Sequence, residues 1–336
     1  YKRKIIANFI SDLYQDIKEN ISFLIFGESE TKSVRHGYVT NAVDAIKSVK
    51  SAVDLAEKSS GIKIKRAYVA ISGTTLRGNT SSGMVVISKA DGEVTNLDIA
   101  KVLEDCEENL NLGNRKIIQV FPVSFRLDGK EVLGRLEGMR GTKLEAKAIF
   151  ITYSIQHLED LLEVIEEAGI KAIDVIPAPM ALSNIVLSER QKIVGVALVS
   201  IGDQTTSLSV FENGLLISVQ TFSIGSADIT NDIALGLKIP LGMAEQLKQG
   251  VVDESISSKK LNEIIEARLS DIFELIDNNL KKIKRSGLLP AGVVFVGGGA
   301  NIKGLEELSK SVLKLPSSLG TTEIFSNVKT KLRDSS

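Results

Sequence analysis

The sequence predicts an α/β protein of two lobes, with a separate α+β module inserted into the first lobe. Two stretches of apolar strands followed by helices predict the lobes, and frequent glycines between short strands set the middle stretch apart. We expect the first lobe at 1–72 plus 154–183, the module at 73–153, the second lobe at 184–320 with a small subdomain at about 250–288, and a polar tail at 321–336.

Composition excludes several classes of protein. The 336 residues carry 41 basic and 42 acidic side chains, and this balance argues against nucleic acid as a principal partner. Two histidines exclude a His-rich metal site, and a single cysteine excludes an intrachain disulfide. Cys106 lies on the apolar face of a predicted helix, which favours a buried structural thiol. We expect a cytosolic chain, because no apolar run is long enough to span a membrane and no signal peptide is visible.

The first lobe and the module are predicted from short apolar runs and helical spacing. The expected strands of the first lobe are 4–9, 21–27 and 67–72, and its helices are about 41–58 and 155–168. Two prolines, Pro177 and Pro179, mark a link into a helix that ends near Leu187. In the module we expect a helix over 96–110 and strands over 84–88, 117–125 and 144–153.

The second lobe carries two stretches that favour ligand binding. An apolar strand from Val196 leads through the small-residue loop Gly202–Thr206 into an alternating strand that ends near Phe211. Backbone amides in such a loop can hold phosphate oxygens, although an ordinary hairpin turn explains the same pattern. A second strand, from Val293, runs directly into three glycines, which permit close approach of the backbone to a ligand.

The remaining helices of the second lobe include one with an unusual cation. Arg268 falls inside the apolar face of the long helix 258–284. A guanidinium there needs a carboxylate partner or a surface contact, unless its stem lies along the core while its head reaches water. The other helices are expected over 226–237, 241–249 and 305–314.

Several segments together resemble one known family. These are Val34–Val39 before the first long helix, Tyr68–Gly73 at the start of the module, Thr230–Ala234, Ile264–Leu269, and Leu289–Val294 followed by the glycine triplet. The chain resembles FtsA, the actin-like bacterial cell division family, from about Phe26 to Gly320, and the pilus protein family PilM is a rival. The resemblance implies a two-lobed actin-like ATPase fold of duplicated ribonuclease-H-like cores, with an inserted subdomain of the 1C or SHS2 type.

The same resemblance implies a nucleotide site for ATP or ADP, with or without magnesium. Matching positions place the second phosphate loop at Gly202, Thr205 and Thr206, and a second phosphate-side turn at Gly225. The pair that meets ribose and adenine matches Glu245 and Lys248, and the adenosine turn matches Gly297, Gly298, Gly299 and Ala300.

The phosphate loops depart from the family pattern. The first loop position, Asn8–Leu13, has neither the expected glycine nor the lysine. The second loop usually reads Asp-Ile-Gly-Gly-Gly-Thr-Thr-Asp, but here Ser200 and Ser207 replace the outer aspartates, and Asp203 adds negative charge. Asp203 could instead hold magnesium from a shifted position. We therefore expect weak or structural nucleotide binding and negligible turnover, with no catalytic residue and no metal ligand assigned.

Three functions follow from the resemblance. The first is a scaffold at the septum that links FtsZ filaments to the inner face of the cell membrane and self-associates as actin-like protofilaments. The others are an active ATPase of the same fold and a PilM-like adaptor of a pilus or secretion machine. The resemblance assigns the FtsZ C-terminal tail to the long helix, and the cations that suit an acidic tail are Arg268, Lys281, Lys282 and Arg285. The cations at the helix end also suit the helix dipole alone.

The membrane is expected to be reached only through a C-terminal helix of the family. Residues 325–336 are too short and too polar to be that helix, so we expect it to be absent from this chain.

Overall fold

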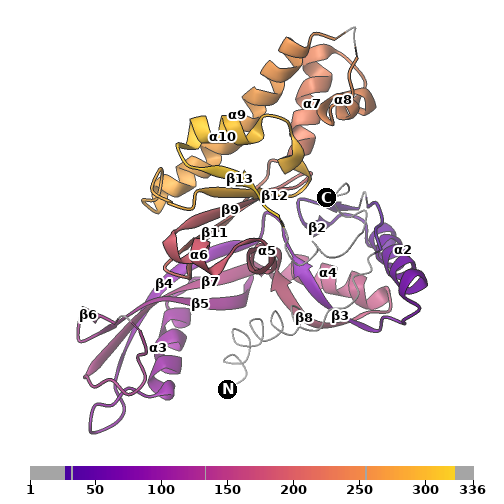
Figure 1. The fold of residues 1–336 in the computed structure, drawn as a ribbon. Helices are drawn as coiled ribbons and strands as arrows, with labels where there is room; N and C mark the ends of the chain where they lie inside the picture. Colours follow the sequence, from indigo (N-terminus) through magenta and orange to yellow (C-terminus); the bar gives the residue numbers. More distant parts are fainter. Residues whose placement is uncertain (1–26, 32, 133, 254–255, 322–336) are drawn as a thin grey trace.

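The computed structural model describes residues 27–31, 33–132, 134–253 and 256–321, and Figure 1 shows their arrangement. The strands expected over 4–9 and over most of 21–27, the first loop at Asn8–Leu13, and the tail from 322 lie outside the described residues. No helix within the described part of the chain is long and apolar enough to cross a membrane.

A five-stranded sheet forms the centre of the second lobe. Its strands lie in the order β11-β10-β9-β12-β13, with β9 antiparallel to β10 and parallel to β12. The bounds are β9 Val196–Ile201, β10 Thr206–Glu212, β11 Leu215–Phe222, β12 Val293–Val296 and β13 Ser317–Leu319. The strand–turn–strand and the strand before the glycine triplet are confirmed, and the parallel pairing brings both to the same edge of the sheet.

Helices cover the upper face of this sheet in Figure 1. The helix α7 packs against α8 and α9, and α10 packs against α9. Their apolar residues join the sheet in one core, in which the rings of Phe273 and Phe295 lie 5.7 Å apart. The bounds are α7 Ser226–Leu237, α8 Leu241–Lys248, α9 Ser258–Lys282 and α10 Leu305–Leu313. All four helices are confirmed, with ends shifted by at most two residues.

The inserted module is a four-stranded sheet with one helix, seen at the lower left of Figure 1. Its strands lie in the order β4-β7-β5-β6, and α3 covers one face. The bounds are β4 Arg77–Val86, α3 Asn96–Glu108, β5 Arg115–Leu127, β6 Lys130–Glu131 and β7 Lys143–Ser154. At its base the opposite face packs on the second lobe, where Ile149 and Ile151 share a core with Val219 of β11.

One strand of the module differs from the prediction, which placed it over 84–88. The strand begins at Arg77, and its first half, 77–81, is polar and contains one glycine, Gly78. Pairing with β7, from Arg77 opposite Thr152 to Val86 opposite Lys143, holds this polar half in the sheet. Tertiary pairing therefore overrides the weak strand propensity of the segment.

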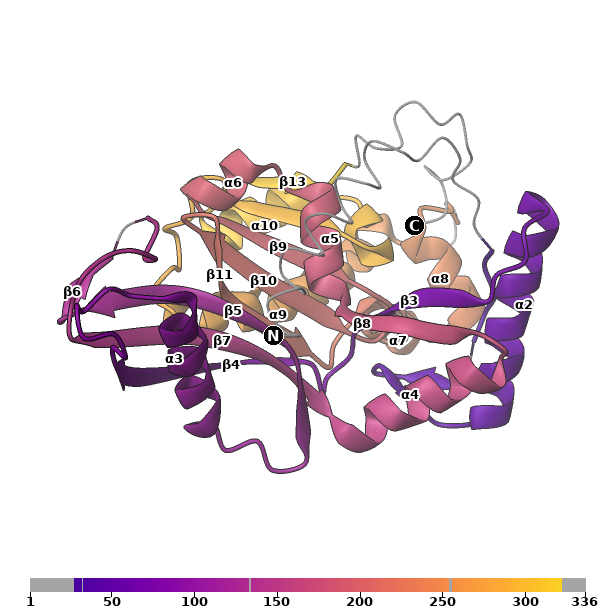
Figure 2. The same cartoon turned by 90° about the horizontal axis from the view of Figure 1, so that it is seen from below.

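The described part of the first lobe lies at the right of Figure 1 and is seen from below in Figure 2. The two helices α2 and α4 pack side by side, and β3 pairs in parallel with β8. The bounds are β1 Val34–Arg35, β2 Tyr38–Val39, α2 Ala42–Ser60, β3 Arg66–Ile71, α4 Ile155–Glu167, β8 Lys171–Pro177, α5 Ala178–Val186 and α6 Glu189–Val194. The strand β8, which ends at the predicted link residue Pro177, and the short helix α6 were not predicted from the sequence.

A buried carboxylate fixes the start of α3 within the module. Asp98 is fully buried and accepts hydrogen bonds from the backbone and hydroxyl of Ser88 and of Thr95. Burial alone would raise the pKa of Asp98, but these four hydrogen bonds outweigh it and hold the pKa well below its ordinary value. The charged form is therefore the one that stabilises the fold.

We expect Asp98→Asn to lower the free energy of unfolding by about 2–3 kcal/mol at pH 7, because an amide cannot accept all four bonds. Since the folded-state pKa is lowered, this contribution is complete above the unfolded pKa of about 4 and disappears as the pH falls below it. Urea unfolding of both proteins at pH 7 and at low pH checks this. An equal difference at every pH would contradict the assignment.

Candidate functional site

The residues predicted to bind nucleotide converge on the end of β9. The loop Gly202–Thr206 follows this strand, and the glycine triplet packs directly against Ile201. The start of α7 joins them, because the amide of Ser226 donates to the Gly202 carbonyl at 2.9 Å. Lys248 of α8 donates to the carbonyl of Ser226 at 3.2 Å. The structure thus brings together residues that lie up to about 100 positions apart in the chain.

Hydrogen bonds within the protein close the loop Gly202–Thr206, but some of its backbone amides have no acceptor among the described residues. The amide of Gly202 donates to the Thr205 carbonyl, and the Thr206 hydroxyl donates to the Ile224 carbonyl. By contrast, the amides at 203, 204 and 205 donate to no other described residue. Backbone amides that have no acceptor within a loop are able to bind an anion.

Gly225 is required by close packing against this loop. A Cβ atom there would lie 2.3 Å from the Asp203 carbonyl oxygen, closer than real contacts allow. The amide of Ala227 donates to the same carbonyl at 2.8 Å. The first turn of α7 therefore binds the loop and fixes its position.

The three glycines of the triplet differ in how much space surrounds them. A Cβ at Gly297 would lie 2.5 Å from the Ile201 carbonyl oxygen, and one at Gly299 would lie 2.3 Å from the Ile201 side chain. Gly298 has no neighbouring atom within 4 Å of such a Cβ. Ala300 is buried in the core. Two of the three glycines are thus explained by strand packing, and Gly298 is the one that faces open space.

Glu245 and Lys248 bind each other on one side of α8. Their side chains form an ion pair of 2.8 Å, in which Lys248 is nearly buried and Glu245 is 40% exposed. The Thr230 hydroxyl donates to Glu245 at 2.6 Å. Burial would raise the pKa of Glu245, but the bonds from Lys248 and Thr230 outweigh it and lower that pKa. The pair is charged and anchored beside the start of α7.

The described residues do not gather carboxylates for a cation. Within them, no group of three or more His, Cys, Asp or Glu side chains is placed to hold a metal ion. The positions where the family has aspartates carry the hydroxyls of Ser200 and Ser207. Among the described residues, the loop at the end of β9 therefore has hydroxyls, and not a set of carboxylates, at these two positions.

Arg268 has a carboxylate partner within the protein. Its Nε and Nη2 atoms donate to the two carboxylate oxygens of Asp232 at 2.6 and 3.0 Å, and Nη1 donates to Asp271 at 3.2 Å. This bidentate contact joins α9 to α7 and raises the pKa of Arg268. About 30% of each partner's side chain is exposed, so the pair is reachable from solvent.

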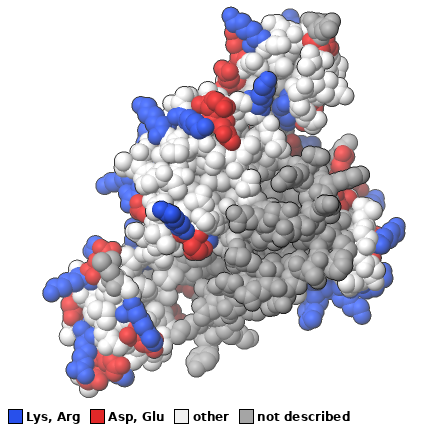
Figure 3. Space-filling model, viewed as in Figure 1, with Lys and Arg blue, Asp and Glu red and all other residues white. Residues whose placement is uncertain are grey.

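The other cations predicted to bind the partner lie near the C-terminal end of α9. Arg285 forms a bidentate pair with Glu212 at 2.7 and 2.9 Å, and Lys281 pairs with Asp277 at 2.7 Å. Lys282 is exposed and has no carboxylate partner among the described residues. On the face in view in Figure 3, positive and negative side chains are intermixed over the second lobe.

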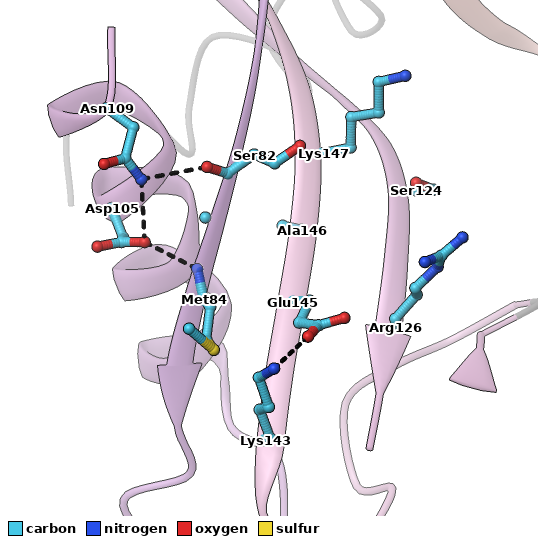
Figure 4. Close-up of a pocket in the computed structure, with 11 residues that line it drawn as sticks. Ser82, Met84, Asp105, Asn109, Ser124, Arg126, Lys143, Glu145, Ala146 and Lys147 are labelled. Atoms are coloured by element: carbon cyan, nitrogen blue, oxygen red, sulfur yellow. Dashed lines mark hydrogen bonds and ion pairs between the residues drawn. The ribbon is translucent and has the colours of Figure 1, made fainter. Parts of the chain in front are cut away.

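One hollow lies away from all of these residues, in the distal part of the module. It has a volume of about 440 Å³ and lies beside the C-terminal half of α3 (Figure 4). Asp105 accepts from the Met84 amide at 2.7 Å and Asn109 donates to the Ser82 carbonyl at 3.1 Å, so α3 side chains satisfy the outer edge of β4. A smaller hollow of about 210 Å³ begins at Ala300 and extends along the start of α10.

Sequence reasoning missed one contact of the loop. Gln204 binds the turn between β1 and β2 through His36. The only signal was the residue itself, since Gln204 stands where the resembling family has a glycine.

Comparisons with known proteins agree with the fold. A family model described as "Cell division protein FtsA" matches residues 197–335, and one described as "SHS2 domain inserted in FTSA" matches residues 73–152. Cell division protein FtsA of Pseudomonas aeruginosa is 28% identical over 316 residues, covering 88% of this chain and 75% of the relative. FtsA of Bacillus subtilis is 28% identical over 333 residues, covering 93% and 74%.

Solved structures show the same architecture. A PilM–PilN type IV pilus biogenesis complex aligns with a TM-score of 0.63 at 16% identity, covering 87% of this chain and 78% of that one. The ethanolamine utilization protein EutJ from Carboxydothermus hydrogenoformans aligns with a TM-score of 0.51 at 16% identity, covering 88% and 75%. At this identity the likeness concerns the fold alone. The predicted actin-like α/β fold with an inserted SHS2 module is confirmed.

Proposed function

Because this chain belongs to the FtsA family of cell division proteins, we propose that it acts as a scaffold at the septum. In this role it links FtsZ filaments to the inner face of the cell membrane and assembles with copies of itself. The observation that carries the proposal is the SHS2 module, which leaves the first lobe after β3 and returns to it before α4 and β8. The PilM-like adaptor is the alternative, and its support is likeness of fold.

We propose that the small subdomain receives the acidic C-terminal tail of FtsZ. The helix α7 packs against both α8 and α9, so we include 226–248 in the proposed subdomain beside the predicted 250–288. Arg268 is its central cation, but Asp232 already occupies the guanidinium. A tail carboxylate must therefore compete with Asp232, while Lys282 offers a charge without an internal partner among the described residues.

We propose weak binding of ATP or ADP at the end of β9. The open face of Gly298 and the pair Glu245–Lys248 support the adenosine end, and the free amides at 203–205 support a phosphate. Bound nucleotide would supply the phosphoanhydride bond, but hydrolysis relies on a positioned metal and water. The described residues supply no carboxylate set for the metal, and Asp203 places a negative charge beside the loop. Turnover should therefore be negligible.

Replacing Lys248 tests the nucleotide proposal. We expect Lys248→Met to weaken ADP binding about tenfold, the effect of losing one charge-assisted hydrogen bond. Calorimetry measures the affinity, and Lys259→Met, which removes an exposed lysine from α9, is the matched control. Phosphate release by the wild-type protein should stay near background, and brisk magnesium-dependent hydrolysis would favour the active ATPase instead.

A further inference from the structure

Gln204 connects the two lobes through two hydrogen bonds to His36. The backbone amide of His36 donates to Oε1 of Gln204 at 3.0 Å. The Nδ1 atom of His36 lies 3.1 Å from the main-chain oxygen of Gln204. Gln204 belongs to the loop between β9 and β10, whereas His36 belongs to the turn between β1 and β2. The contact therefore joins the second lobe to the first across 168 positions of sequence.

The His36 end of this contact is bound to both segments that connect the module to the first lobe. The Thr74 amide, at the start of the module, donates to the His36 carbonyl at 3.0 Å. The buried Tyr153 hydroxyl, at the end of the module, lies 2.7 Å from the Gly37 carbonyl oxygen and 3.0 Å from that of Ser72. The β1–β2 turn is thus bonded to the chain both where it enters the module and where it leaves the module.

Gly37 makes this fit possible. Its φ angle is +88°, and a Cβ atom there would lie 2.3 Å from Cα of Gly73. Two backbones therefore touch at the hinge without an intervening side chain. The turn and the start of the module are therefore in direct backbone contact.

The loop that carries Gln204 is also held in place by contacts with its own lobe. The carbonyls of Gly202 and Asp203 accept from the first two amides of α7, and Gly225 packs against the Asp203 carbonyl. A continuous set of contacts therefore runs from α7 through the loop and the β1–β2 turn to the module.

We infer that Gln204 is an internal latch, which holds the two lobes and the module in one arrangement through protein groups alone. The Oε1 atom of Gln204 accepts from the first lobe, while the backbone of the Gln204 loop is held by α7 of the second lobe. All of these contacts are between protein groups, and the inference goes beyond the proposed role in division.

Two substitutions of Gln204 distinguish the effect of its side-chain hydrogen bond from the effect of its side-chain size. Gln204→Met keeps the length of the side chain but removes the acceptor, whereas Gln204→Glu keeps an acceptor oxygen. Hydrogen exchange of the full chain without nucleotide, read on peptides covering 34–39, reports the His36 amide. We expect exchange to accelerate roughly two- to tenfold in Gln204→Met and to stay at the wild-type rate in Gln204→Glu. Gln156→Met, on the exposed side of α4, is the control and should change nothing there.

A distance measurement tests whether the bond holds the lobes. Spin labels at Ser51→Cys on α2 and Ser311→Cys on α10 report the separation of the lobes. Burial raises the pKa of the Cys106 thiol to about 11, which keeps the native cysteine unreactive. We expect a narrow distance distribution in the wild type, a broader one in Gln204→Met and the wild-type one in Gln204→Glu. The same distribution in wild type and Gln204→Met would overturn the inference, whatever the exchange rates.

Discussion

Gly297→Ala should lower the free energy of unfolding by about 3 kcal/mol or more. Two costs add at this position. The residue has φ +87° and ψ 168°, a region of backbone space that is essentially restricted to glycine. Its Cβ would also lie 2.5 Å from the Ile201 carbonyl oxygen, so β9 and the turn would have to separate. Urea unfolding measures the change.

Gly298→Ala is the matched control for this substitution. Nothing lies within 4 Å of its Cβ position, so we expect a stability change within about 0.5 kcal/mol. A larger side chain, as in Gly298→Leu, should leave stability similar but weaken ADP binding, because it projects into the space proposed for adenosine. Equal destabilisation by Gly297→Ala and Gly298→Ala would show that the triplet is not divided as described.

Substitutions in the Arg268–Asp232 pair should move the affinity for an FtsZ tail peptide in opposite directions. Arg268→Ala is expected to weaken binding by roughly 1.5–3 kcal/mol, the usual value for a charge-assisted hydrogen bond. Asp232→Asn should tighten binding, because it removes the negative charge that competes for the guanidinium. Binding of the acidic peptide should weaken as salt rises. Anisotropy titrations of a labelled peptide give all of these affinities.

The control for this pair is Arg135→Ala. Arg135 is an exposed arginine of the module that also pairs with a carboxylate, Glu137, and it lies far along the chain from α9. It should leave the peptide affinity unchanged. Circular dichroism verifies that each variant is folded. If both Arg268→Ala and Asp232→Asn bind the peptide as the wild type does, the pair is a structural link between α7 and α9 and not part of the binding surface.

Most elements of the described fold could be predicted from local patterns. Helix α9 is recognisable from its apolar face and β9 from its continuous apolar run. One strand was predicted too short and another was not predicted, for the same physical reason. The polar first half of β4 and the whole of β8 are strands because β7 and β3 pair with them, and such pairing is not visible in the segments themselves.

The candidate site was predictable as a set of positions but not as a set of interactions. Family resemblance placed Glu245, Lys248 and the glycine triplet together, and the structure brings them to the end of β9. The resemblance did not indicate that Ile201 leaves no room for a side chain at Gly297 and Gly299. The position of Arg268 on the apolar face of its helix left a carboxylate partner, a surface contact and a solvent-reaching head open. The structure shows the carboxylate of Asp232 on α7, which depends on the packing of two helices.

Co-sedimentation with FtsZ tests the central claim most directly. The full chain should pellet with GTP-assembled FtsZ filaments at moderate salt and stay in the supernatant with filaments that lack the acidic C-terminal tail. This result is expected if the chain is an FtsA-type scaffold that recognises the tail. Equal pelleting with both kinds of filament would contradict tail recognition, and no pelleting with either would contradict the scaffold role and favour the PilM-like adaptor.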